Sequence, residues 1–360
     1  MPAPAAEPAT GPGQWVHLPL FGLSVAPSSR LTLGEAETPL EPAPQLGAEL
    51  GIPGLWLKRE DLSPTGSHKA RAMGLLCSLL REQGHSQAVI SSSGNAALAA
   101  AAFCRQGGLS LLCLLSPRTP RAKLEAVLAE GATVVLSERP VALLRHAVRA
   151  WGLSDLRTST NPEGPTAYRG IAAELLRQGL PPAGVFLYSS SGATALGVLE
   201  GFQRLLPESG RPQVHPVEME PGGEITRPWY PPPAPSPGLR AWEPAGELGT
   251  RRSRLAPRLR REARASGGRG WRVGSAGLEW ARRAADRHRL ETSWEGLAAL
   301  GAMSQASLPG PGPWVAVLSG AAWQLDLAAA EDPRSLAALA GSEEELDRVL
   351  EGAGFLRQAP

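Results

Sequence analysis

Lys69 is the residue of this chain whose type and position best suit covalent chemistry. Lysine is rare here: Lys58, Lys69 and Lys123 are the only lysines, and arginine supplies nearly all other positive charge. An arginine stays protonated, whereas a lysine amine can lose its proton and form an imine with an aldehyde. Ser67 is expected to cap a helix that starts near His68, and the dipole at a helix N-terminus disfavours a permanent cation. The sequence therefore predicts that Lys69 acts as a neutral amine or an imine.

Two short serine-rich segments, 91–95 and 189–194, could each hold an anion. Each follows an expected strand and opens an expected helix, and the first turn of a helix offers unpaired N–H groups and the positive end of its dipole. Serine and glycine are also ordinary cap and turn residues, so either segment alone is a weak signal. Neither contains the Gly-Lys-Ser/Thr of a phosphate-binding loop or the G-x-G-x-x-G pattern, which argues against a nucleotide.

Together these features indicate pyridoxal phosphate. This cofactor needs an amine that forms an imine, a phosphate site, a partner for its ring nitrogen and a carboxylate site for the amino acid. Lys69 supplies the amine, and the two serine-rich segments supply the anion sites. Ser319, at the end of an expected strand, supplies a hydroxyl for the ring nitrogen.

The elements expected to position these residues follow an α/β pattern. Expected strands and helices alternate along the chain, with strands at 88–90, 109–115 and 133–136 and helices at 95–106, 121–130 and 141–151. Strands that alternate with helices of about ten or more residues predict a parallel sheet with helical crossovers. A second group of strands is expected at 55–57, 184–188, 214–218 and 314–318.

The length of 360 residues is sufficient for two domains with separate cores. We therefore expect an α/β protein with two domains, each a parallel sheet with flanking helices. The expected parts are a smaller domain at 62–155, a larger cofactor domain at 15–61 plus 156–360, a disordered tail at 1–14 and a Pro-rich loop at 228–250.

The composition disfavours several other classes of protein. A net charge of +2 gives no general bias toward nucleic acid or membrane, and no apolar run approaches the ~18 residues of a membrane span. The three cysteines form neither a metal-binding spacing nor a disulfide framework. The first residues lack the pattern of a signal peptide. We therefore expect a cytoplasmic protein with no metal site and no membrane partner.

A series of short motifs follows one order along the chain. They are a Thr-Pro-Leu turn at 38–40, the lysine context Pro64-Thr65-Gly66-Ser67-His68-Lys69, the helix start Ser93-Gly94-Asn95-Ala96-Ala97, the pair Asn161-Pro162, the loop at 189–194 and the pair Ser319-Gly320. In this order they resemble the motifs of the fold-type-II pyridoxal-phosphate enzymes, the tryptophan synthase β-like superfamily, and most closely the threonine synthases. Each motif is short, and their common order from about residue 34 to 320 makes the resemblance specific.

The resemblance implies a role for individual residues. Lys69 would carry the cofactor and move the proton at the substrate's Cα, and Asn95 would bind the cofactor's phenolic oxygen. Ser319 would face the pyridine nitrogen; a neutral hydroxyl there accompanies elimination and replacement in this family. The cofactor phosphate would be held by Ser190, Ser191, Gly192, Ala193 and Thr194. The substrate would be bound by Ser92, Ser93 and Gly94, with Arg71 and Arg169 as candidate partners for an anionic group.

Three positions depart from the threonine synthase pattern. His68 stands where those enzymes usually have phenylalanine, and Ala193 stands where glycine is usual. The arginine suited to a substrate phosphate falls on Gly164, and only Arg169 matches a later lysine of that motif. A charge-assisted hydrogen bond is worth roughly 1.5–3 kcal/mol, so its loss would weaken binding of a phosphorylated substrate by about one or two orders of magnitude.

The leading hypothesis is a pyridoxal-phosphate lyase that deprotonates Cα of a small amino acid and eliminates or replaces a β or γ substituent, as threonine synthases do. One alternative is deamination of the kind catalysed by serine/threonine dehydratases, and another is a cofactor-binding relative without turnover. An RNA-associated protein is disfavoured, because the arginines at 251, 254, 258, 261 and 264 have no stacking aromatic residues interleaved and fit one face of a solvated helix. The resemblance implies a homodimer.

Overall fold

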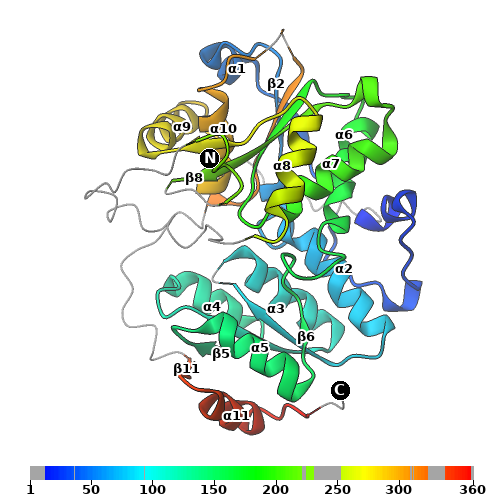
Figure 1. The fold of residues 1–360 in the computed structure, drawn as a ribbon, viewed down its shortest axis with the longest axis vertical. Helices are drawn as coiled ribbons and strands as arrows, with labels where there is room; N and C mark the ends of the chain where they lie inside the picture. The colour runs from blue at the N-terminus through cyan, green and yellow to red at the C-terminus, as the bar shows by residue number, and fades with distance from the viewer. Residues whose placement is uncertain are drawn as a thin grey trace, which may run out of the picture.

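The structure is a computed structural model that describes residues 13–35, 37–92, 94–220, 224–230, 253–308, 310, 312–322 and 337–357. The described residues form two β-sheets, each covered by helices on its faces. Figure 1 shows one layer of sheet and helices above the other, with α2 where the two meet. The α/β architecture with two parallel-rich sheets agrees with the prediction from the sequence.

The larger sheet has six strands in the order β1-β2-β10-β7-β8-β9. Their bounds are β1 (Leu40–Pro42), β2 (Leu55–Lys58), β7 (Gly184–Tyr188), β8 (Gln213–Met219), β9 (Trp271–Val273) and β10 (Trp314–Val317). β1 runs antiparallel to β2, and all other pairs are parallel. Every residue of β7 and β10 is buried, as expected for parallel strands that carry helices on both faces.

The smaller sheet has five parallel strands in the order β11-β5-β4-β3-β6. Their bounds are β3 (Gln87–Ser91), β4 (Ser110–Leu115), β5 (Thr133–Leu136), β6 (Ser154–Asp155) and β11 (Ala338–Leu339). The expected strand at 133–136 agrees with β5 at both ends, and the expected strand at 184–188 agrees with β7.

Three apolar cores hold the helices on these sheets. One core lies on the inner faces of both sheets and includes α2 (Lys69–Glu82), α3 (Asn95–Gly107), α4 (Arg121–Ala129), α6 (Arg169–Arg177), α7 (Ala193–Leu205) and α8 (Ala256–Ala265). The outer face of the larger sheet carries α1 (Pro44–Leu50), α9 (Ser275–Arg287) and α10 (Trp294–Met303). The outer face of the smaller sheet carries α5 (Pro140–Trp151) and α11 (Glu343–Gly352). Among the described helices, none is long and apolar enough to cross a membrane.

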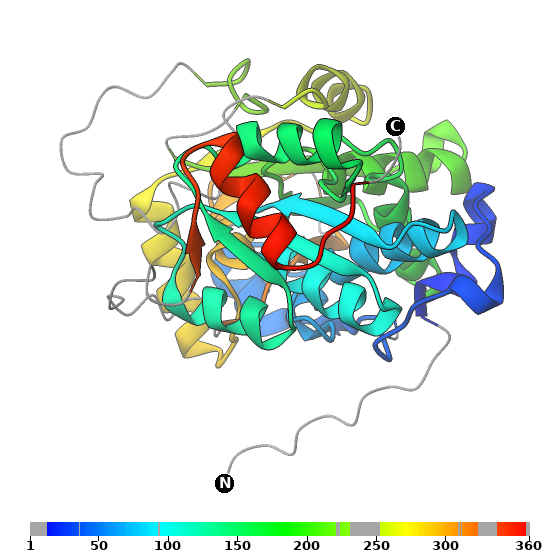
Figure 2. The same cartoon turned by 90° about the horizontal axis from the view of Figure 1, so that it is seen from below.

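The C-terminal segment packs on the smaller sheet, which corrects the expected assignment of all of 156–360 to the larger domain. β11 pairs with β5, and α11 places Leu346 and Leu350 in the core that covers the outer face of this sheet. Figure 2 shows α11 lying across that face beside α5. The physical reason is that α11 has one apolar side and the smaller sheet has an apolar outer face to cover. The domain limits at 61/62 and 155/156 stay a prediction.

Two other expected segments lie partly outside the described residues. Of the expected tail at 1–14, residues 1–12 are outside, whereas Gly13 and Gln14 are buried and begin a short 3-10 helix, Gly13–Val16. Of the expected Pro-rich loop at 228–250, residues 231–250 are outside the described part of the chain.

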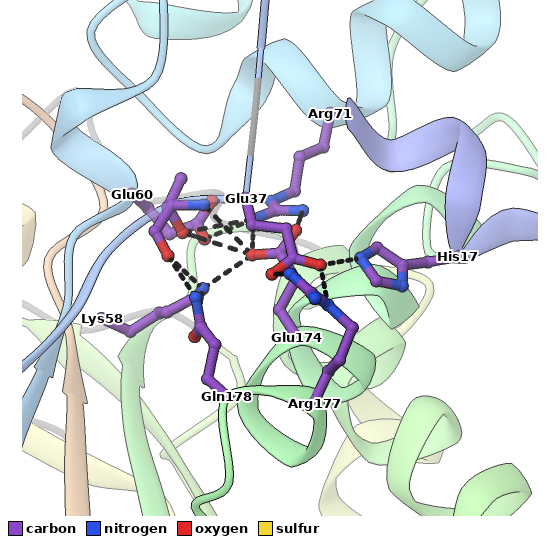
Figure 3. A network of polar contacts seen from close by, with 9 residues as sticks. His17, Glu37, Lys58, Glu60, Arg71, Glu174, Arg177 and Gln178 are labelled. Carbon is purple, nitrogen blue, oxygen red and sulfur yellow. Dashed lines mark hydrogen bonds and ion pairs between the residues drawn. The ribbon is translucent and has the colours of Figure 1, made fainter. Parts of the chain in front are cut away.

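A buried cluster of ion pairs fixes the start of α2. Arg71, in its first turn, donates to Glu60 at 2.7 and 2.8 Å and to Glu174 at 2.6 and 2.8 Å. Glu174 also accepts from Lys58 Nζ at 2.6 Å (Figure 3). All four side chains are almost completely buried. Burial alone would raise the pKa of Glu174, but the charges of Arg71 and Lys58 outweigh burial and lower that pKa.

Glu174→Gln should destabilise the protein strongly. The amide would leave Arg71 and Lys58 buried with one carboxylate fewer, and removal of one partner from a buried ion pair costs about 3–5 kcal/mol. Urea unfolding followed by circular dichroism measures this loss. The matched control is Glu125→Gln, which removes an exposed pair with Arg121 and should cost no more than about 0.5 kcal/mol. If both variants lost the same free energy of unfolding, the stabilising role of the buried ion pairs would be contradicted.

Candidate active site

A cavity of about 270 Å³ lies at the carboxyl ends of strands from both sheets. Ser91 ends β3, Leu114 lies near the end of β4, and Tyr188 ends β7. The starts of α2, α3, α5, α7 and α10 contribute the rest of the wall. The described lining residues are His68, Lys69, Ser91, Ser92, Gly94, Asn95, Ala96, Leu114, Ser116, Pro140, Tyr188, Ser189, Ser190, Ser191, Gly192, Thr194 and Glu295. In α/β proteins this edge of a sheet is the usual place for a ligand.

The cavity brings together most of the residues that the sequence singled out. Of the residues predicted to bind cofactor or substrate, those that line the cavity are Lys69, Ser92, Gly94, Asn95, Ser190, Ser191, Gly192 and Thr194. Ala193 is completely buried as the first residue of α7 and does not line the cavity. Ser93, the remaining expected substrate ligand, lies outside the described residues.

Lys69 is the first residue of α2 and reaches the cavity with its amine. Burial lowers the pKa of Lys69 to about 8, and the charge of Glu295 opposes this change. The Nζ atom lies 5.5 Å from the centre of the Tyr168 ring. The expected cap differs slightly: His68 is the residue before the helix, and Ser67 Oγ accepts from the Lys69 N–H at 3.3 Å. Near physiological pH a minority of the amine is therefore neutral, a far larger fraction than for an exposed lysine, chiefly because of burial.

His68 places an unpartnered acceptor beside Lys69. Its Nδ1 lies 2.8 Å from the carbonyl oxygen of Ser319, and since a carbonyl only accepts, Nδ1 carries the proton. Burial, followed by the charge of Lys69, holds the pKa of His68 well below its ordinary value, so the ring is neutral. Its Nε2 is buried and has no hydrogen-bond partner among the described residues. A neutral ring with Nδ1 protonated leaves Nε2 as an acceptor.

Two helix N-termini face the cavity without a side-chain cap. Gly94 precedes α3 and Gly192 precedes α7, and a glycine has no side chain that could accept from the first N–H groups of its helix. Gly192 has a φ of 91°, a left-handed conformation that favours glycine. Both helices have 13 residues, and their first N–H groups can therefore bind a phosphate and a carboxylate.

The donor set of the site fits pyridoxal phosphate. Lys69 provides the amine, and the starts of α3 and α7 provide two anion sites in one cavity. Ser319 does not line the cavity, but its Oγ is buried without a partner among the described residues, and its carbonyl oxygen binds His68 in the cavity wall. A buried hydroxyl that lacks a partner is unfavourable unless a ligand supplies one. The orphaned Ser319 hydroxyl thus fits a partner for the ring nitrogen.

The two arginines expected as substrate ligands do not line the cavity, and we correct that prediction. Arg71 is buried between Glu60 and Glu174. It lies two residues after Lys69, and two residues along an α-helix turn the side chain by about 200°. Arg169 donates to Glu200 at 2.6 Å and its guanidinium lies 5.9 Å from the centre of the Phe21 ring. Both charges are therefore neutralised inside the protein.

Glu295 is a lining residue that sequence reasoning missed. It lies in the first turn of α10, and only 8 % of its surface is exposed. A signal for it was present, because Glu295 is the one charged residue in the otherwise apolar helix Trp294–Met303. Charged residues are rarely buried unless a partner or a function requires them.

Comparison with known proteins identifies relatives of this chain. The human protein named L-serine dehydratase/L-threonine deaminase is 30% identical over 182 residues, which cover 47% of this chain and 53% of that protein. A threonine synthase of Synechocystis is 36% identical over 107 residues, which cover 29% of this chain and 28% of the relative. The matches thus span about half the length of these curated relatives, or less.

The fold is shared with solved structures. The processed form of threonine deaminase isoform 2 from Solanum lycopersicum matches with a TM-score of 0.66 at 22% identity, and the match covers 95% of this chain and 87% of that one. This confirms the predicted fold-type-II architecture. A family model described as pyridoxal-phosphate dependent enzyme matches residues 31–320. With a match over most of its length, and with a cavity that fits the cofactor, this chain belongs to the family of pyridoxal-phosphate dependent enzymes.

Proposed function

We propose that this protein is an ammonia-lyase that deaminates a small hydroxyamino acid such as serine or threonine. The observation that carries the proposal is one cavity that joins the Lys69 amine to two helix N-termini and contains no arginine among its described lining residues. The relatives support it, because the human serine dehydratase/threonine deaminase matches 182 residues and the threonine synthase 107. The alternative drawn from the sequence thus fits better than the leading hypothesis of a threonine synthase-like reaction.

A phosphorylated substrate fits this site poorly. At Gly164, where the resemblance places the phosphate-binding arginine, an added Cβ would lie 2.4 Å from the carbonyl oxygen of Thr158. No side chain can extend from this position without a backbone shift. Arg71 and Arg169 are occupied by carboxylates. Apart from Lys69, which would hold the cofactor, the described lining residues include no lysine or arginine for a substrate phosphate, which supports an unphosphorylated substrate.

The proposed roles follow from the wall of the cavity. When bound, pyridoxal phosphate supplies an aldehyde carbon for an amine and a ring that withdraws electrons from the substrate's Cα. Lys69 would hold the cofactor and remove the Cα proton, since its lowered pKa leaves a usable fraction of neutral amine. The N-terminus of α7, with Ser190, Ser191 and Thr194, would bind the phosphate. The N-terminus of α3, with Ser92, would orient the substrate carboxylate.

Serine, threonine and phosphohomoserine separate the candidate reactions. We expect the purified holoenzyme to release ammonia and a 2-oxo acid from serine or threonine, because elimination of the β-hydroxyl needs only the groups in the cavity. A coupled assay for the 2-oxo acid measures this. Release of inorganic phosphate from phosphohomoserine, without deamination of serine or threonine, would instead support the threonine synthase-like reaction. Binding of the cofactor without turnover of any of the three would support a non-catalytic relative.

Lys69 should be the covalent attachment point of the cofactor. Borohydride reduction of the holoenzyme followed by peptide mapping should label Lys69, and Lys69→Ala should abolish the label and lower activity by at least ~10²–10⁴-fold. The control is Lys123→Ala, which changes a lysine on α4. This variant should keep both the label on Lys69 and the activity unchanged. A label on Lys58 or Lys123 would contradict the proposed role.

The rate of cofactor attachment should depend on pH with a midpoint near 8. Below the pKa of Lys69 the amine is an ammonium ion and cannot attack an aldehyde; above it the amine is neutral, so the rate rises with pH and then levels off. From pH 7 to pH 9 the neutral fraction grows about ten-fold. Stopped-flow absorbance after pyridoxal phosphate is added to cofactor-free protein measures the rate. Butylamine, a free amine, is the control, and its rate of reaction with pyridoxal phosphate should keep rising beyond pH 9. If the rate for the protein also kept rising beyond pH 9, the lowered pKa of Lys69 would be contradicted.

A further inference from the structure

Glu295 contributes a carboxylate to the described cavity wall, and its charge acts on Lys69. The side chain is more than nine-tenths buried, lines the cavity and makes no hydrogen bond or ion pair with the described residues. Among the described lining residues it is the one acidic group, and Lys69 is the one that is cationic. The carboxylate therefore faces the space that a ligand would occupy.

The proposed function assigns the N-terminus of α7 to the cofactor phosphate and the N-terminus of α3 to the substrate carboxylate. An amino acid whose side chain carries a further negative charge would find no arginine in the described wall, and it would face Glu295 within the same 270 Å³. Like charges about 6–10 Å apart, at an effective dielectric constant of about 20, repel enough to weaken binding roughly ten- to hundred-fold.

A side chain that donates a hydrogen bond meets the opposite situation. The buried Nε2 of His68 is an acceptor without a hydrogen-bond partner among the described residues, and the Glu295 carboxylate in the same cavity wall is a second acceptor. A hydroxyl group can donate to either of them, whereas a carboxylate or a phosphate dianion can donate to neither.

We propose that Glu295 is the specificity-determining residue of this site, which admits amino acids with a neutral, hydrogen-bond-donating side chain and excludes those with a carboxylate or a phosphate. The inference rests on the proposed function of the cavity as an amino-acid site. It deepens that function, because it names the charge of the substrate's side chain as the property that the site selects.

Binding is measured by titrating the holoenzyme with L-serine and O-phospho-L-serine while the absorption of the bound cofactor is followed. Wild-type protein should bind O-phospho-L-serine at least about ten-fold more weakly than L-serine. Glu295→Gln, which keeps the shape and removes the charge, should reduce this ratio about ten-fold or more. Glu295→Asp, which keeps the charge, is the matched control and should retain most of the discrimination. An unchanged ratio in Glu295→Gln would overturn the inference.

A comparison within the wild-type protein needs no variant and keeps the inference testable if a variant fails to fold. L-asparagine and L-aspartate have nearly the same shape and differ by one charge, so the wild type should bind asparagine at least about ten-fold more tightly than aspartate. Equal binding would overturn the charge selection alone. Failure of L-serine and every other amino acid tested to change the cofactor spectrum would overturn the proposed function and, with it, this inference.

Discussion

Arg71 lies between two carboxylates with almost no access to water, and its position determines where the chemistry of this protein can take place. Its guanidinium forms two parallel hydrogen bonds to each of Glu60 and Glu174, the geometry in which such pairs are strongest. These contacts tie the first turn of α2 to the segment after β2 and to α6. Because Lys69 is two residues away on the same turn, the buried ion pairs also fix the backbone from which its amine enters the cavity.

The cavity combines three simple physical effects at one point. Burial depresses the pKa of a lysine amine, two uncapped helix N-termini provide positive potential for anions, and a neutral histidine presents a lone pair. None of these requires an unusual residue. They act together because the carboxyl ends of β3, β4 and β7, which belong to two sheets, face the same space.

Much of the fold and part of the site could be predicted from the sequence. β5 and β7 are apolar runs bounded by turn residues, so their limits were predictable, and the rarity of lysine pointed to Lys69. The ion pairs of Arg71 and Arg169 could not be predicted, because their partners Glu174 and Glu200 lie 103 and 31 residues away along the chain. Two arginines at the start and end of α8 likewise have partners that are distant in the sequence: Arg258 pairs with Glu200, and Arg264 lies over Trp229.

The pairing of β11 with β5 has a consequence for how the smaller layer is encoded. Residues 62–155 contain four of its five strands, while the helix that covers Val89, Leu112 and Trp151 from outside comes from the far end of the chain. Any continuous stretch that contains this whole layer therefore also contains β7, β8, β9 and β10 of the larger sheet. During synthesis α5 can cover part of the outer face early, but α11 completes that face only after β10 of the larger sheet has been made.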